Sequence, residues 1–486
     1  MARRWIALIL LCSAMFIVVL DATIVNIALP SIGRELSFSQ QNLSWVINGY
    51  AITFGGCLLL GGRLADLLGR RRVFISGLLL VAVASLAAGF SDNEGQLIAA
   101  RGAQGLGAAL IAPSALSIIT TTFSDGAERN KALGAWGAIA GGAGAVGVLL
   151  GGALTEGLGW EWVLWVNVPV ALVVAALAPR LIAESRSEAA TRRFDTAGAV
   201  TVTAGLALLV YAIVDATDAG WGSGQTLGLL GAAAVILSAF IAIELRSEAP
   251  LVRFAIFRIR TLTGANIVGL LVGGSLSSMF FFVTLYMQQV LGYSAIEAGV
   301  AYLPLAVTIF AGSWGASQLV TRIGFKPVLA TGMGMLAVAL VWFSRISVDG
   351  SFLADILGPS IIGGAGLGLA FVPVTIAAVS GVRPQESGLA SGLINTSQRI
   401  GAALGLAVLV TVATSRTDDL VASGGGDPAA LPNALVEGFQ SAFLGAAAIA
   451  LLGVALTLAL IRSSDSRAHL ALGAAAGEEA VAEADA

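Results

Sequence analysis

Residues 62–72 read Gly62-Arg63-Leu64-Ala65-Asp66-Leu67-Leu68-Gly69-Arg70-Arg71-Arg72, a charged turn between two long apolar runs. A connection between two membrane helices needs only a few polar residues. This one also carries an aspartate, glycines and a basic cluster. The excess of charge and glycine predicts a conformational latch made of Gly62, Asp66, Gly69, Arg70 and Arg71, which holds the flanking helices in one state and releases them in another. A plain solvated turn is the alternative interpretation.

The composition is that of an integral membrane protein. Of the 486 residues, 57% are hydrophobic and 11% are charged, and the mean hydropathy is +0.90. A soluble domain carries about 25% charged residues, so these charges cannot cover a water-exposed surface of this size. The net charge of −3 argues against a nucleic-acid partner. Cys12 and Cys57 lie in apolar runs and His469 is the only histidine, so we expect no metal site and no cofactor.

About fourteen stretches are long and apolar enough to cross a membrane. They lie near residues 6–29, 43–60, 73–90, 97–119, 132–153, 162–178, 197–214, 226–244, 263–285, 298–320, 328–345, 353–375, 388–413 and 438–461. The first is interpreted as a retained helix, because no clear signal-peptide cleavage site follows it. With a cytoplasmic N-terminus, roughly 21 of the 26 Lys and Arg residues fall on the cytoplasmic side. This bias predicts that both termini are cytoplasmic.

The chain also repeats itself. Residues 317–326, which contain Gly324 and Lys326, resemble residues 62–71 at a distance of 255 residues (324 − 69). Two related halves in one membrane chain are typical of secondary transporters, in which one half rocks against the other. The spacing predicts an N-terminal six-helix bundle over 1–178, a loop and two inserted helices over 179–262, a C-terminal six-helix bundle over 263–462 and a disordered cytoplasmic tail over 463–486.

Five motifs lie in order along nearly the whole chain. They are Leu20 to Pro30, Gly62 to Arg72, Arg101 to Gly105, the segment from Trp160 to Pro169, and the group Gly392, Asn395, Arg399, Gly401 and Gly405. Together they resemble the major facilitator superfamily, in particular its fourteen-helix drug:proton antiporter branch of the EmrB/QacA type. The resemblance implies an all-α fold of two six-helix bundles plus two inserted central helices. It also implies export of amphipathic, drug-like compounds in exchange for protons across a bacterial plasma (inner) membrane.

The fifth apolar run fits the family pattern only in part. Gly134, Gly147, Gly151 and Gly152 resemble the antiporter motif, but Val148 stands where that motif has proline. The glycines predict a helix that packs closely and can slide or bend, with tight packing alone as the alternative. The departure leaves open a narrow-specificity, proton-linked metabolite transporter, either exporter or symporter. A lipid-handling or sensor membrane protein is the other alternative.

Two opposite charges are expected at one depth in the membrane. Asp21 lies about fifteen residues into the first apolar run, roughly 23 Å from the cytoplasmic face of a core roughly 30 Å thick. Arg101 lies about five residues into the fourth run, which crosses in the opposite direction, and is roughly 7–8 Å from the outer face. We expect Asp21 to take and release the coupling proton beside Arg101, with Gln104 orienting the guanidinium. A static ion pair is the alternative.

Six residues are candidates for lining a substrate cavity: Asn48, Tyr50, Phe281, Gln288, Asn395 and Arg399. The ninth apolar run mixes aromatic, Met and hydroxyl side chains, which suit bulky, partly apolar molecules. By the repeat this run corresponds to the first and should face the cavity, with a lipid-facing phenylalanine cluster as the alternative. Arg399, near mid-membrane, predicts a counter-charge for an anion or a carboxylate.

The energy source is expected to be the proton gradient. The sequence contains no catalytic constellation and no Gly-x-x-x-x-Gly-Lys pattern, so we expect neither enzymatic activity nor ATP hydrolysis. One pH unit supplies about 1.4 kcal/mol per proton and 100 mV about 2.3 kcal/mol. The expected partners are small amphipathic substrates, protons and the lipid bilayer.

Overall fold

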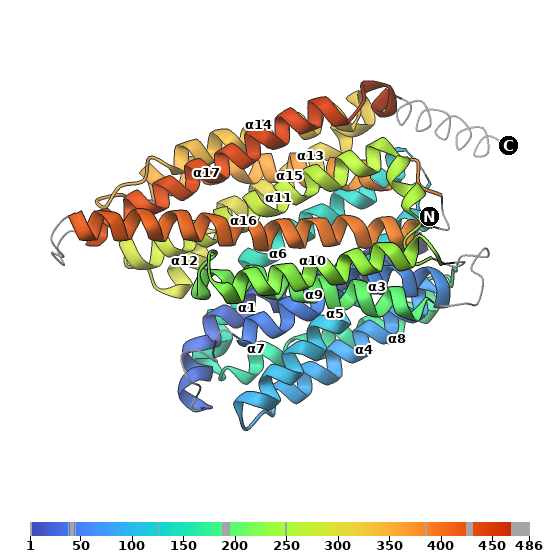
Figure 1. Cartoon of the computed structure of the whole chain (residues 1–486), viewed down its shortest axis with the longest axis horizontal. Helices are drawn as coiled ribbons and strands as arrows, with labels where there is room; N and C mark the ends of the chain where they lie inside the picture. The colour runs from blue at the N-terminus through green and yellow to red at the C-terminus, as the bar shows by residue number, and fades with distance from the viewer. Residues whose placement is uncertain are drawn as a thin grey trace. The chain divides into compact units, whose positions relative to one another are not determined.

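The computed structural model describes residues 2–36, 38, 43, 45–124, 126–186, 195–247, 250–383, 386–423 and 431–467. Within these ranges every regular element is a helix (Figure 1). Thirteen helices are long and apolar enough to cross a membrane, and a bent pair, Ala127–Gly144 and Leu149–Gly157, adds a fourteenth span. The prediction of an all-helical membrane protein is therefore confirmed.

Among the described residues, helices up to residue 258 carry most of the predicted polar sites. They are α1 (Ala2–Glu35), α3 (Trp45–Leu68), α4 (Arg70–Gly89), α5 (Glu94–Thr122), α6 (Ala127–Gly157), α7 (Glu161–Trp165), α8 (Asn167–Leu181), α9 (Thr196–Ala219), α10 (Gly224–Glu244) and the 3-10 helix η1 (Phe254–Arg258). They are followed by α11 (Arg260–Leu285), the π-helix η2 (Tyr286–Val290), α12 (Ala295–Ala301), α13 (Leu303–Ile323), α14 (Phe325–Phe343), the π-helix η3 (Phe352–Leu357), α15 (Gly358–Val379), α16 (Ser387–Ser423) and α17 (Leu431–Leu460).

Capping side chains mark several helix starts between the apolar runs. The Asn93 side chain accepts a hydrogen bond from the backbone N–H of Gln96 at 3.0 Å at the start of α5. Asp195 caps α9 in the same way through the N–H of Gly198, at 2.7 Å. These oxygens satisfy N–H groups that have no partner within the helix, so they help to fix where α5 and α9 begin.

The contacts within the chain define two compact units, and all but one of their boundaries fall inside helices. Unit 1 comprises Met1–Ser124, Val146–Thr263 and Ala378–Thr396, and unit 2 comprises Asp125–Ala145, Gly264–Ala377 and Ser397–Ala486. The inserted helices α9 and α10 thus belong to unit 1, as does the beginning of α16. The predicted domain boundaries at residues 178 and 262 were placed from the sequence repeat. The two units, in contrast, group residues by their contacts in the structure.

Unit 1 encloses its polar residues in an apolar core. Within it, α3 packs against α5 and α9, and α4 packs against α5 and α8. A buried cluster joins Leu20 and Ile24 of α1 to Leu97 of α5 and Val163 of α7. Because such a core excludes water, a charged side chain that points into it needs partners within the protein.

Unit 2 is held together by aromatic and aliphatic packing. Helices α14 and α17 run side by side (Figure 1), and the rings of Phe343 and Phe443 stack between them at 5.2 Å. Residues 463–467 are helical, and the backbone N–H of Lys326 donates to the Ser466 hydroxyl at 3.3 Å. The expectation of disorder from residue 463 therefore fails for these five residues, because Ser466 packs against the start of α14. The rest of the predicted tail, residues 468–486 with His469, lies outside the described residues.

Candidate functional site: a buried acid–base cluster and a helix-capping latch

Asp21 and Arg101 meet inside unit 1. A guanidinium Nη1 of Arg101 donates to Asp21 Oδ2 at 2.7 Å, and the two side chains are 1% and 3% exposed. Gln104, one turn along α5, accepts from the same Nη1 at 2.8 Å and donates to Asp21 Oδ1 at 3.1 Å. The structure thus brings together all three residues that the sequence assigned to proton coupling.

Arg101 has further partners that do not depend on Asp21. Its Nε donates to the backbone carbonyl of Val46 at 2.9 Å, and its guanidinium carbon lies 4.6 Å from the ring centre of Tyr50. Tyr50 is itself fixed, because its hydroxyl donates to the carbonyl of Val18 at 3.0 Å. A cation over an aromatic face gains about 0.5–2 kcal/mol. Tyr50, expected in the substrate cavity, is therefore part of the acid–base cluster.

Two members of the cluster are not predicted by the sequence. Asn167, the first residue of α8, donates from Nδ2 to Asp21 Oδ1 at 2.7 Å. Ser85 of α4 accepts from Gln104 Nε2 at 2.7 Å. Asn167 lies within the family motif from Trp160 to Pro169, and Ser85 carries no signal that separates it from other helical serines. Both side chains are fully buried.

The charge of Asp21 is satisfied inside the protein. As a carboxylate, Asp21 accepts from Arg101, Gln104 and Asn167, and alone in the membrane this charge would cost at least about 3 kcal/mol. Arg101 also bonds to Val46 and Gln104 and contacts Tyr50. The cation therefore has partners besides the carboxylate.

The second site is built around Asp66 at the end of α3. Its Oδ1 accepts from the backbone N–H of Gly388 and its Oδ2 from that of Leu389, both at 3.1 Å. Both N–H groups belong to the first turn of α16, where no partner exists within the helix and the helix dipole favours a negative charge. Arg70 completes the site by donating from Nη2 to Oδ1 at 2.9 Å. Arg70, which the sequence also places in the latch, is thus the basic partner of Asp66.

Gly62 permits this capping arrangement. A methyl group at Gly62 would lie 2.4 Å from the carbonyl oxygen of Gly388, and one at Gly388 would lie 2.4 Å from the carbonyl oxygen of Gly62. The two backbones therefore touch only because both residues lack a side chain. Nearby, the hydroxyls of Ser117 and Ser387 lie 2.7 Å apart and join α5 to the same turn.

Gly69, Arg70 and Arg71 contact the segment that follows α8. Gly69 has a φ of 109°, which non-glycine residues rarely adopt, and a methyl group there would lie 2.7 Å from the Glu184 carboxylate. That carboxylate accepts from the backbone N–H of Arg71 at 3.1 Å, at the start of α4. The N–H of Arg70 donates to the carbonyl of Ser185 at 3.0 Å. Glu184 is thus a further latch residue that the sequence did not indicate.

Glu386 is a third acid near the latch, after Asp66 and Glu184. Glu386 precedes α16 and accepts from Arg383 at 2.7 Å, and Arg253 lies 3.8 Å from the same carboxylate. The hydrogen bond to Glu386 raises the pKa of Arg383 above its usual value. Because the guanidinium groups are largely exposed, the pairs orient the segment rather than stabilise the fold strongly.

The glycines of α6 divide between the two units. In unit 1, a methyl group at Gly147 would lie 2.2 Å from the Thr23 hydroxyl, and one at Gly151 would lie 2.8 Å from the carbonyl of Ile24. Gly152, the residue after Gly151, is also buried. In unit 2, a methyl group at Gly134 would lie 2.7 Å from the Cβ of Ser317. The close packing predicted for these glycines is present, and their role as a sliding surface stays a prediction.

The remaining cavity candidates are distributed over both units. Asn48 is half-buried and Asn395 donates to the Ser391 carbonyl of its own helix at 2.8 Å, both within unit 1. In unit 2, Phe281 is 36% exposed, and Gln288 and Arg399 are half-buried. The substrate cavity therefore stays a prediction. In the part of the chain that the structure describes, no group of three His, Cys, Asp or Glu residues is placed to hold a metal ion.

Comparison with known proteins identifies the family. The model of the Major Facilitator Superfamily matches residues 11–406. The puromycin resistance protein pur8 of Streptomyces alboniger is 39% identical over 472 residues, which cover 96% of this chain and 93% of that protein. The cephamycin export protein CmcT of Amycolatopsis lactamdurans is 40% identical over 461 residues, covering 94% and 93%. The human organic anion transporter MFSD10 (TETRAN) shares the fold, with a TM-score of 0.63 and 16% identity over 93% of this chain and 99% of that one. The chain belongs to the Major Facilitator Superfamily and is a multi-pass membrane transporter, not an enzyme.

Proposed function

We propose that the protein exports amphipathic, drug-like compounds from the cell in exchange for protons, with Asp21 as the proton carrier. The observation that carries this proposal is the Asp21 carboxylate, buried in unit 1 and bonded to Arg101 and two neutral donors. A buried acid whose partner cation is independently held can change its charge without leaving that cation unsatisfied. This is what coupling a proton to a conformational change requires.

The second part of the proposal concerns the change of conformation, and it rests on the latch around Asp66. Asp66 caps the first turn of α16, and losing this cap would expose two backbone N–H groups and one carboxylate. The cap therefore favours one access state, and a change elsewhere in unit 1 has to overcome it to reach the other. N-cap interactions contribute about 0.5–2 kcal/mol, which is comparable with the energy supplied by one proton crossing the membrane.

The relatives support the choice of substrate class and compartment. One is named for resistance to puromycin and the other for export of cephamycin, and both come from bacteria. By this similarity the substrates are antibiotic-like molecules and the location is the bacterial plasma (inner) membrane. The excess of basic residues in the predicted cytoplasmic loops supports cytoplasmic N- and C-termini. The energy source in this proposal is the proton gradient, with no cofactor and no ATP.

Everted membrane vesicles test the proposal. Vesicles with the protein are energised to an acidic interior, and uptake of a panel of dyes and antibiotics is followed with and without a protonophore. The proposal predicts uptake that needs the gradient and stops within seconds of protonophore addition. Uptake that persists without a gradient, or that occurs only when the interior is alkaline, would contradict proton antiport.

A narrow exporter of one metabolite is the second candidate. Each of the two relatives is named for a single antibiotic, which favours a dedicated substrate over a broad panel. The same vesicles distinguish the two candidates. Gradient-dependent uptake of several unrelated compounds supports multidrug export, whereas uptake of one compound class alone supports the narrow exporter.

A further inference from the structure

The segment that follows the inserted helix α10 is bonded to the last part of α3. Arg63 of α3 donates from Nη2 to the backbone carbonyl of Pro250 at 3.1 Å, although the two residues are 187 positions apart in the chain. Arg63 stands three residues before Asp66, so the two side chains project from neighbouring positions on one helix. A residue next to the latch is therefore tied to the connection between α10 and η1.

Glu244, the last residue of α10, holds this connection in shape. Its Oε1 accepts from the backbone N–H of Leu251 and its Oε2 from that of Val252, both at 3.2 Å. Glu244 is only 3% exposed, so water competes little for these bonds. A methyl group at Gly198 would lie 2.6 Å from Oε1, because the start of α9 packs against the same carboxylate. Residues 250–253, which we call the strap, are thus fixed to the inserted helices α9 and α10.

The strap also reaches the start of α16. A guanidinium Nη1 of Arg253 lies 3.8 Å from Oε1 of Glu386, the residue before α16. Two residues later, the backbone N–H of Gly388 donates to Asp66. The contacts therefore close a ring within unit 1. Asp66 joins α3 to α16, and the strap contacts α3 through Arg63 and the start of α16 through Arg253.

The links of this ring differ in strength. The Arg253–Glu386 pair is long and its guanidinium is 48% exposed, so it contributes little. The bonds of Glu244 and Arg63 are at least partly buried, and each joins a charged group to the backbone. Such bonds are roughly twice as strong as bonds between neutral groups. The charges of Asp66 and Glu244 also attract Arg63. Arg63 and Glu244 are therefore the residues through which the strap acts.

We propose that the strap positions the latch: by holding Arg63, it keeps Asp66 in place to cap the first turn of α16. Arg63 and Glu244 are then positioning residues for transport, since both act on the capping bonds through Asp66. The inserted helices α9 and α10 set how firmly the latch is closed. This inference rests on the proposed role of Asp66 as a latch and extends that role to the inserted helices.

Hydrogen–deuterium exchange tests the strap in the whole protein, reconstituted in lipid nanodiscs. The readout is the exchange rate at the start of α16, in peptides that contain the two N–H groups bonded to Asp66. Asp66→Asn is expected to accelerate this exchange about two- to thirtyfold, the range for a lost cap. Arg63→Gln leaves Asp66 unchanged and is expected to accelerate it about two- to tenfold. Glu244→Gln should act in the same direction, because its amide turns a donor toward one of the strap N–H groups.

A double variant shows whether Arg63 acts through Asp66. In that case, adding Arg63→Gln to Asp66→Asn produces no further acceleration, because the bonds that the strap supports are already lost. Arg63→Lys keeps a positively charged donor. It is expected to restore most of the protection that Arg63→Gln removes.

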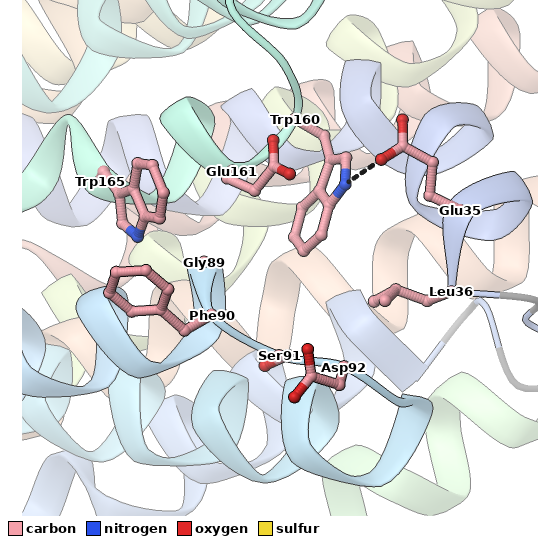
Figure 2. Close-up of a pocket in the computed structure, with 9 residues that line it drawn as sticks. All are labelled: Glu35, Leu36, Gly89, Phe90, Ser91, Asp92, Trp160, Glu161 and Trp165. Atoms are coloured by element: carbon pink, nitrogen blue, oxygen red, sulfur yellow. Dashed lines mark hydrogen bonds between the residues drawn. The ribbon is translucent and has the colours of Figure 1, made fainter.

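Two controls match these substitutions in type. Arg246→Gln removes an exposed guanidinium from the same connection, two residues after Glu244. Glu35→Gln changes an acid that lines a pocket with Gly89, at the end of α4 opposite to the latch (Figure 2). There the indole Nε1 of Trp160 donates to Glu35 at 3.1 Å. Both controls are expected to leave the exchange at the start of α16 at the wild-type rate.

Two results would overturn the strap. In the first, Arg63→Gln accelerates the exchange of residues 250–253 and leaves the start of α16 at the wild-type rate. In the second, the effect of Arg63→Gln adds in full to that of Asp66→Asn. Peptides from α14 report whether each variant is folded. If Arg63→Gln is unfolded, Glu244→Gln takes its place in both comparisons.

The outcome is independent of the vesicle assay. None of these measurements uses transport, so a failure of proton-driven uptake leaves the exchange result intact. Unchanged exchange in Asp66→Asn would instead remove the latch, and the strap with it.

Discussion

The carboxylate of Asp66 accepts the backbone N–H of Gly388 at 3.1 Å, so a side chain of α3 caps a helix that begins more than three hundred residues later in the chain. Helix starts are usually capped by the residue that precedes them. Here the cap comes from a distant span, so a movement of α3 away from the start of α16 would break it. This makes the contact suited to a reversible latch.

Removing the capping carboxylate is expected to slow transport more than it impairs folding. In Asp66→Asn the shape is kept, but one carboxylate oxygen becomes an amide donor that faces a backbone N–H. We predict at least about a tenfold loss of turnover, which corresponds to about 1.4 kcal/mol and lies within the range for a lost cap. Vesicle uptake and the amount of inserted protein are the measurements. Asp349→Asn, an exposed loop acid, serves as the control. Wild-type turnover in Asp66→Asn would rule out the latch.

A methyl group at Gly62 is expected to separate the two helices. Gly62→Ala would place a carbon 2.4 Å from the carbonyl oxygen of Gly388, closer than real contacts allow, so the start of α16 has to move. We predict reduced turnover and a lower melting temperature. Gly334→Ala is the matched control, because Gly334 lies inside α14 with no atom within 4 Å of the added methyl. The idea fails if the two variants behave alike.

Two glycine variants separate the effect of the Gly69–Glu184 contact on stability from the effect of backbone strain. Gly69→Ala combines a φ of 109° with a methyl group 2.7 Å from the Glu184 carboxylate. Gly220→Ala has a φ of 85° and no atom within 4 Å of the methyl. Each variant pays about 1–2 kcal/mol for the left-handed conformation. We predict a larger loss of thermal stability in Gly69→Ala, and equal losses would show that Glu184 contributes nothing at this site.

Asn167 is expected to set the pH at which transport responds to protons. Its Nδ2 donates to Asp21 Oδ1 at 2.7 Å. Asn167→Ala removes that donor from the group proposed to carry the proton, so the midpoint of the pH profile of vesicle uptake should shift. Asn48→Ala, a half-buried amide on α3, is expected to leave the midpoint in place. A profile unchanged in Asn167→Ala would limit this residue to packing.

The membrane fold and the Asp21–Arg101 pair could be predicted because they depend on length and depth alone. Apolar runs of sufficient length define spans, and the rise per residue places a charge along a span. Asp21 and Arg101 needed no further information. Which way a helix faces around its own axis is a different matter, since it is set by packing. That is why the contact between the Tyr50 ring and the guanidinium of Arg101 could not be predicted.

The residues that sequence reasoning missed are neutral or lie in connecting segments. Asn167 and Ser85 carry no charge, and helical membrane proteins contain many such residues without a special role. Glu184 lies in the segment after α8, and its contact with Arg71 spans 113 residues. No periodicity or motif spacing reports such a contact. Likewise, the repeat predicted two halves, but it could not reveal that the beginning of α16 groups with unit 1.

The most direct test of proton coupling through Asp21 is counterflow in proteoliposomes of the Asp21→Asn variant. Asparagine keeps the size of the side chain but cannot exchange a proton. The account predicts that the variant still equilibrates labelled substrate across the membrane, yet fails to accumulate it when a pH gradient is imposed. The wild-type protein should do both. Accumulation by Asp21→Asn at the wild-type level, with the same response to the gradient, would contradict the account.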